Sequence, residues 1–130
     1  MNSITTRTAI ISLEKQNFVR MTMRDQVYLE LIDMQENHHA ENLLTNHNPH
    51  VVLIDTRLNS LSSDEARKFS AGEEPVRYRA AVALLFKGLA GRIGANSMIT
   101  IYQPKVLTAK FSDETKAIAW LNDKLISSTL

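Results

Sequence analysis

The chain contains no cysteine among its 130 residues. Disulfide bonds, thiolate catalysis and cysteine-ligated zinc sites are therefore excluded, and the composition is compatible with a reducing, intracellular setting. An excess of charge of one sign is also missing, because 15 basic residues are set against 14 acidic ones, which leaves a net charge of +1. Binders of nucleic acid or of anionic membranes usually carry a clear positive excess, so neither partner is expected.

Long apolar runs are missing as well. None approaches the roughly 20 residues that a bilayer-crossing helix needs, and residues 1–11 show no small-residue cleavage pattern. We therefore expect a cytoplasmic protein with no integral membrane segment. Hydrophobic residues make up 44% of the chain, which is typical of a globular protein. One domain that spans residues 1–130 is the expectation.

The hydrophobic pattern predicts five strands. Residues 8–14 and 18–23 predict an antiparallel pair joined by a short polar turn. Residues 51–54 and 80–86 are wholly apolar runs, which are typical of strands covered on both faces. Residues 106–111 predict the last strand.

Four helices are predicted between and after these strands. Acidic residues such as Asp33 fall on the outer side of the first helix. Ser62 and Glu65 have the spacing of a capping box at the start of the second. The helices follow Asp25, Ser62 or Ser63, Gly88 and Ser112. The residues predicted to face the core are Val27, Tyr28, Leu31, Ile32 and Met34 in the first helix, Leu89, Ile93, Met98 and Ile101 in the third, and Ala117, Ile118, Leu121 and Leu125 in the fourth.

This order of elements predicts the class of fold. Strands that alternate with helices form right-handed crossovers and a parallel sheet. We therefore predict a mixed α/β fold with a mostly parallel sheet of about five strands, about four helices and an N-terminal antiparallel hairpin.

Several segments carry a family pattern: Val51–Arg57, Ser63–Arg67, Ala80–Leu85, Arg92–Asn96, Gln103–Lys105, Phe111–Glu114 and Ala119–Leu121. In these segments the chain resembles the small bacterial STAS-like (SpoIIAA-like) proteins. Their fold is related to the anti-sigma-factor antagonist of sporulation and, more distantly, to CRAL-TRIO lipid-binding domains. The resemblance covers residues 51–124 well and the N-terminal third only in the order of its elements.

The resemblance implies a binding or regulatory module of STAS-like fold rather than an enzyme. It implies a homodimer that docks a protein partner through residues 62–69. The alternative that it implies is a carrier that holds a small apolar or lipid-like ligand between the sheet and the helices. We expect no cofactor and no catalytic residues, because no serine nucleophile stands in a G-x-S-x-G elbow.

Ser62 and Ser63 are candidate partner-binding or phosphorylated residues. The antagonist proteins carry a phosphorylatable serine at the corresponding helix N-terminus, but here Asp64 and Glu65 replace a small Ser-Gly pair. A helix N-terminus attracts phosphate, whereas two adjacent carboxylates repel it. Phosphorylation and helix capping are therefore both open for these serines.

Polar residues at the carboxyl ends of the parallel strands form a candidate ligand crevice. Ligands of open α/β sheets bind outside these ends. The candidate residues are Asp55, Arg57, Lys87, Arg92 and Asn96. Gly88, Gly91 and Gly94 follow the second buried strand, and they either expose backbone N–H groups to an anion or permit a tight turn and close packing.

The histidines do not predict a metal site. His38 and His39 are adjacent in a predicted helix and so point about 100° apart. His47 and His50 lie in a polar loop. We therefore expect all four to be solvated residues, with no metal bound.

Overall fold

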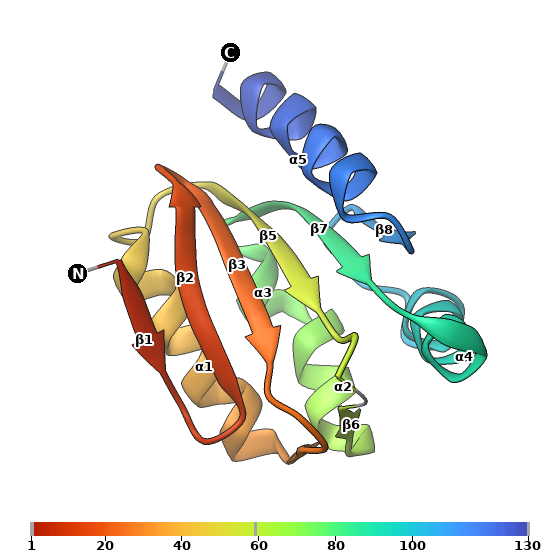
Figure 1. Ribbon diagram of the computed structural model, residues 1–130. Coiled ribbons are helices and arrows are strands. Elements are labelled where there is room, and N and C mark those ends of the chain that lie inside the picture. Colours follow the sequence, from red (N-terminus) through yellow and green to blue (C-terminus); the bar gives the residue numbers. More distant parts are fainter. Residues whose placement is uncertain (1, 59, 130) are drawn as a thin grey trace.

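The computed structural model describes residues 2–58 and 60–129 (Figure 1). Strands and helices alternate along most of the chain, as predicted. The strands are β1 (Ser3–Thr5), β2 (Ala9–Lys15), β3 (Phe18–Met23), β4 (Tyr28–Leu29), β5 (His50–Asp55), β6 (Leu61–Ser62), β7 (Arg79–Leu85) and β8 (Thr108–Phe111). The helices are α1 (Leu31–Leu44), α2 (Asp64–Ala71), α3 (Glu73–Val76), α4 (Gly88–Thr100) and α5 (Glu114–Thr129).

The main sheet has the strand order β1-β2-β3-β5-β7-β8. β1, β2 and β3 pair antiparallel, whereas β3 with β5, β5 with β7 and β7 with β8 pair parallel. The predicted mixed sheet behind an N-terminal hairpin is therefore confirmed. The sheet has one strand more than predicted, because β1 is only three residues long and too short to show a periodic pattern.

β5 and β7 lie side by side in the middle of the sheet, and helices cover both faces of it (Figure 1). Successive side chains of a strand point to opposite faces. In β5, Val52 and Ile54 therefore join a cluster with residues of α1 and α4, whereas Val51 and Leu53 join a second cluster with α5. α5 covers one face, and α1 and α4 lie over the other.

α1 packs through a largely polar face, so its predicted inner face was wrong for Tyr28, Leu31 and Ile32, whereas Val27 and Met34 pack against the core. Leu31 and Ile32 are 37% and 58% exposed, whereas Asp33 is buried. Asp33 accepts hydrogen bonds from Nε and Nη2 of Arg7 at 3.0 and 2.5 Å, which compensate the burial of its carboxylate. A hydrophobic pattern does not reveal a carboxylate that is buried by pairing. The buried residues of α1 are Asp33, Asn37, His38, Ala40, Glu41, Asn42 and Leu44.

α2 begins with a serine cap, but the capping residue is Ser63 and not Ser62. The Oγ atom of Ser63 accepts a hydrogen bond from the amide of Ala66 at 3.1 Å. Ser62 belongs to β6, where its carbonyl accepts a hydrogen bond from Arg67. The predicted capping box between Ser62 and Glu65 was therefore wrong by one position in the sequence.

The inner face of α5 matches its prediction. Ala117, Leu121 and Leu125 are buried, and Ile118 packs against their cluster. The side chain that accepts a backbone amide at the start of α5 is Asp113, which receives the N–H of Lys116 at 3.2 Å. Across residues 2–58 and 60–129, no helix has the length and apolar character needed to span a bilayer.

The position of the α2 cap generates a stability prediction. Ser63→Ala removes the acceptor of the Ala66 amide and should lower the free energy of unfolding by about 1 kcal/mol. Urea denaturation measures this change. Ser62→Ala is the matched control and should change stability by less than about 0.5 kcal/mol. A larger loss in the Ser62 variant than in the Ser63 variant would contradict the assignment.

Candidate functional site

A cavity of about 610 Å³ lies between α4 and the α1-covered face of the sheet. We call it the apolar cavity. Hydrophobic side chains of three adjacent strands line it: Met23 from β3, Ile54 from β5, and Val82 and Leu84 from β7. Ser60, Leu61 and Ser62, together with α2, form another part of its wall. The apolar cavity therefore separates α4 from the sheet over part of its length.

The small residues of α4 explain why this space exists. Ala95 is the buried residue of this 13-residue helix, and Ala90, Gly91, Gly94 and Ser97 also line the cavity. The predicted inner face was wrong for Leu89 and Ile101, which are 74% and 70% exposed, whereas Met98 and the half-exposed Ile93 line the cavity. Small side chains toward the sheet leave unfilled volume that larger ones would occupy.

Two glycines shape the start of α4. Gly88 has a φ of +75°, a conformation that favours glycine, where the chain turns from β7 into the helix. A Cβ atom on Gly91 would lie 3.2 Å from the Cβ of Phe86. Of the two interpretations that the sequence left open for these glycines, these contacts favour the tight turn and close packing.

The C-terminal end of α4 is tied to α2. The hydroxyl of Tyr102 donates a hydrogen bond to Oδ1 of Asp64 at 2.7 Å. The guanidinium of Arg67 lies 5.4 Å from the centre of the Tyr102 ring, within the range of a cation–π contact, and also donates to the Ser62 carbonyl at 2.6 Å. These contacts hold one wall of the apolar cavity in place.

A buried charge cluster stands beside the cavity. Glu41 of α1 is fully buried and accepts hydrogen bonds from Nε and Nη2 of Arg79 at 2.9 and 2.6 Å. Nε2 of His50, also fully buried, lies 2.5 Å from Oε2 of Glu41. Arg79 begins β7 and also lines the apolar cavity. The cluster therefore joins α1 to the first residues of both central strands.

The pKa of Glu41 reflects this environment. Burial by itself raises the pKa of a carboxyl group, because it disfavours the charged form. Here the charge of Arg79 and the hydrogen bonds from Arg79 and His50 outweigh burial and lower the pKa of Glu41 to about 2. Glu41 is therefore ionised at neutral pH and compensates the charge of Arg79.

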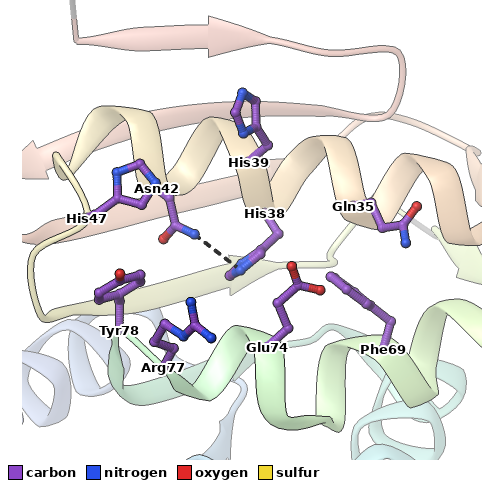
Figure 2. A pocket seen from close by; sticks show the side chains of 9 residues that line it. All are labelled: Gln35, His38, His39, Asn42, His47, Phe69, Glu74, Arg77 and Tyr78. Carbon is purple, nitrogen blue, oxygen red and sulfur yellow. Dashed lines mark hydrogen bonds between the residues drawn. The ribbon is translucent and has the colours of Figure 1, made fainter.

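A second pocket, which is polar and measures about 310 Å³, lies between α1 and the segment that runs from α2 to the start of β7 (Figure 2). Asn42 Nδ2 donates to His38 Nε2 at 3.2 Å, while His38 Nδ1 and Asn42 Oδ1 are buried without a partner among the described residues. Burial, followed by the charge of Arg79, lowers the pKa of His38. The lining residues are Gln35, His38, His39, Asn42, His47, Phe69, Glu74, Arg77 and Tyr78.

The four histidines differ in their surroundings. His38 and His50 are 6% and 0% exposed, so the prediction that they are solvated was wrong. His39 and His47 are exposed, as predicted. In the part of the chain that the structure describes, no group of three or more histidine, aspartate or glutamate side chains has the arrangement of a metal site.

The five predicted crevice residues do not gather around one space. Lys87 alone among them lines the apolar cavity. Asp55 follows Val51 and Leu53 on the α5 face, where Arg57 donates to its carboxylate at 2.9 and 2.7 Å. Arg92 is exposed on α4, and Asn96 accepts a hydrogen bond from Lys110.

Asp55 belongs to an ion network at the carboxyl edge of the sheet. Nη1 of Arg20 lies 3.7 Å from Oδ2 of Asp55, and both Arg20 and Arg57 contact Glu114 at the start of α5. Burial raises the pKa of Asp55, but the hydrogen bonds from Arg57 outweigh it, and the net pKa is lowered. Asp55 therefore anchors α5 rather than facing the apolar cavity.

Residues 11–125 match the family model described as Domain of unknown function (DUF7793). This match covers most of the chain. The chain belongs to the DUF7793 family. No curated protein shows a significant match to it.

The crystal structure of an uncharacterized protein from the DUF3478 family, with a SpoIIAA-like fold and from Shewanella loihica, is similar in fold. The TM-score is 0.62 at 18% sequence identity, and the match covers 93% of this chain and 99% of the other. The predicted STAS-like (SpoIIAA-like) fold is therefore confirmed. At this identity the likeness concerns the fold alone.

Sequence reasoning missed Arg67 and Arg79 as residues of the site. Arg79 directly precedes an apolar run, a position at which a buried charge must find a partner. The partner, Glu41, lies 38 positions earlier, and no spacing rule connects the two. The small residues Ala90, Gly91, Gly94 and Ala95 were a readable signal, but only the glycines were interpreted, as an anion site or as a tight turn with close packing.

The charge cluster predicts that Glu41 stabilises the fold strongly. Glu41→Gln leaves the guanidinium of Arg79 buried without a counter-charge and should lower the free energy of unfolding by about 3 kcal/mol. Chemical denaturation measures this loss. Glu36→Gln on the exposed side of α1 is the control and should cost less than about 0.5 kcal/mol. Equal effects of the two substitutions would contradict the role of the cluster.

Acid should destabilise the protein in a defined range of pH. The pKa of Glu41 is lowered from 4.5 to about 2, and that of Asp55 is lowered from 3.8. Their stabilisation is therefore complete above the unfolded-state values and lost as the pH falls toward the folded-state ones. Urea midpoints should fall slightly below about pH 6.5, where His38 takes up a proton more readily in the unfolded chain, and fall more steeply below about pH 5 as the carboxylates are protonated. A constant midpoint down to about pH 3 would show that these carboxylates do not stabilise the fold.

Proposed function

We propose that this protein is a non-enzymatic binding module that holds a small apolar or lipid-like molecule between the sheet and α4. The observation that supports the proposal is the apolar cavity of about 610 Å³. Ligand pockets usually measure roughly 300–1,000 Å³ and are lined by apolar side chains with a few polar groups. The apolar cavity has both the size and this type of lining.

The packing of protein interiors supports a ligand over a packing defect. Interiors are close-packed, and unfilled apolar volume costs stability in proportion to its size. The cluster under α5 is fully buried at its centre, where Leu53 and Leu85 are each 0% exposed. The space beside α4 is partly open to solvent, and most of the helix residues that line it are small. A ligand in the apolar cavity would recover the contacts that this helix does not make.

The protein-docking function remains a prediction. Nothing among the described residues favours a particular partner for residues 62–69. The hydroxyl of Ser63 accepts the Ala66 amide, which favours capping over phosphorylation at that residue. The absence of enzymatic activity likewise remains a prediction.

Filling the apolar cavity should abolish binding of an apolar probe. N-phenyl-1-naphthylamine is neutral and gains fluorescence in apolar surroundings. Ala95→Phe places a large ring at a buried position that lines the cavity and should remove most of this fluorescence gain. Ala119→Phe adds the same ring to an exposed position of α5 and should leave it unchanged. Binding that survives in the Ala95 variant would place the probe elsewhere and contradict the proposal.

Native mass spectrometry of freshly purified protein provides a second measurement. A bound molecule with a mass of a few hundred daltons, absent from the Ala95→Phe variant, is the result that the proposal expects. The same spectrum counts the subunits and so tests the predicted homodimer. A ligand-free wild-type protein that also fails to bind the probe would leave the proposal without support.

A further inference from the structure

The charged residues around the apolar cavity are all of one sign. Three cationic side chains line it: Arg67 from α2, Arg79 from β7 and Lys87 at the start of α4. The lining contains no aspartate or glutamate among residues 2–58 and 60–129. An apolar space whose charged boundary groups are all positive favours an anionic ligand over a cationic one.

One of these three charges is already compensated. Both carboxylate oxygens of Glu41 accept hydrogen bonds from Arg79. Arg67 and Lys87 differ, because neither forms an ion pair with any residue that the structure describes. Arg67 has only a carbonyl and an aromatic ring as partners, and its Nε atom is buried without a hydrogen-bond partner. Neither Arg67 nor Lys87 therefore has a carboxylate of the described residues within ion-pair distance, and the nearest negative influence on Arg67 is the Asp64 carboxylate that Tyr102 already holds.

The start of α4 adds to this positive character. Lys87 is the N-cap residue, its side chain caps no backbone amide, and the first turn contains no acidic residue. The first N–H groups of a helix have no partner within the helix and carry the positive end of its dipole. Ala90 and Gly91, both in this turn, line the apolar cavity.

We infer that the ligand of the apolar cavity is an amphipathic anion, with a hydrocarbon tail against the sheet and an acidic head group held by Arg67 and Lys87. This inference rests on the proposed function and names the chemistry of its ligand. A carboxylate or phosphate matches unpaired arginine and lysine side chains through charge-assisted hydrogen bonds. A neutral apolar ligand fills the cavity equally well but offers neither side chain an ion pair.

Competition with N-phenyl-1-naphthylamine tests the head group. Dodecanoate, dodecyl phosphate and dodecanol share one tail and differ in charge. Below their micelle-forming concentrations, at least one of the two anions should displace the probe from the wild-type protein at a roughly tenfold lower concentration than dodecanol does. The stronger of the two anions identifies the head group as a carboxylate or a phosphate.

Charge variants locate the effect. Arg67→Met with Lys87→Met should remove the preference for the anions, measured as the ratio of the displacing concentrations of each anion and dodecanol. The matched control, Lys15→Met with Lys116→Met, removes two exposed charges that do not line the cavity and should keep the preference. If the double variant fails to fold, Lys87→Met alone, at an exposed position, should weaken the preference.

The outcomes separate this inference from the proposed function. Equal displacement by dodecanol and the anions overturns the anionic head group and leaves apolar binding intact. A preference for the anions that survives in the double variant overturns the role of Arg67 and Lys87. Failure of the wild-type protein to bind the probe or any of the three competitors overturns the proposed function and this inference together.

Discussion

The ionised carboxylate of Glu41 holds together three parts of the fold that are distant in sequence. It comes from α1, accepts hydrogen bonds from the first residue of β7 and contacts the first residue of β5. A charge at a fully buried position is tolerated only where it is paired and hydrogen-bonded, so this contact fixes how α1 lies on the sheet. Both pockets depend on that placement. Arg79, which pairs with Glu41, lines the apolar cavity, and His38, which lies on the same helix as Glu41, lines the polar pocket.

The two faces of the sheet are packed according to different rules. Under α5, the side chains of Ala117, Leu121 and Leu125 meet β5 and β7 in a buried hydrophobic cluster. Beside α4, most of the helix residues that face the strands are small, and the same sheet borders an unfilled space. A buried hydrophobic contact on the α5 side and spare volume on the α4 side are together compatible with a binding module. The packing of α5 supports the sheet from one side, and the space between the sheet and α4 is available to a ligand.

Much of the fold could be predicted from the sequence, and much less of the site. β5 and β7 could be predicted because short, wholly apolar runs are typical of strands covered on both faces. The helical spacing of the apolar residues in α5 was equally clear. The buried face of α1 could not be predicted. Asp33, Asn37 and Glu41 are held inside by Arg7, Thr8 and Arg79, partners that periodicity does not reveal. The predicted crevice shared only Lys87 with the cavity, because the carboxyl ends of adjacent strands direct alternate residues to opposite faces.

The two edges of the sheet have a consequence for how copies of this chain can meet. β1 has three residues and β8 has four, and Lys110 lies within β8. Short edges with a charged residue present little backbone for an incoming strand, which is a common protection against uncontrolled assembly. Sheet extension from molecule to molecule is therefore disfavoured at either edge, and any pairing of protomers must rely on contacts between side chains on helical or loop surfaces.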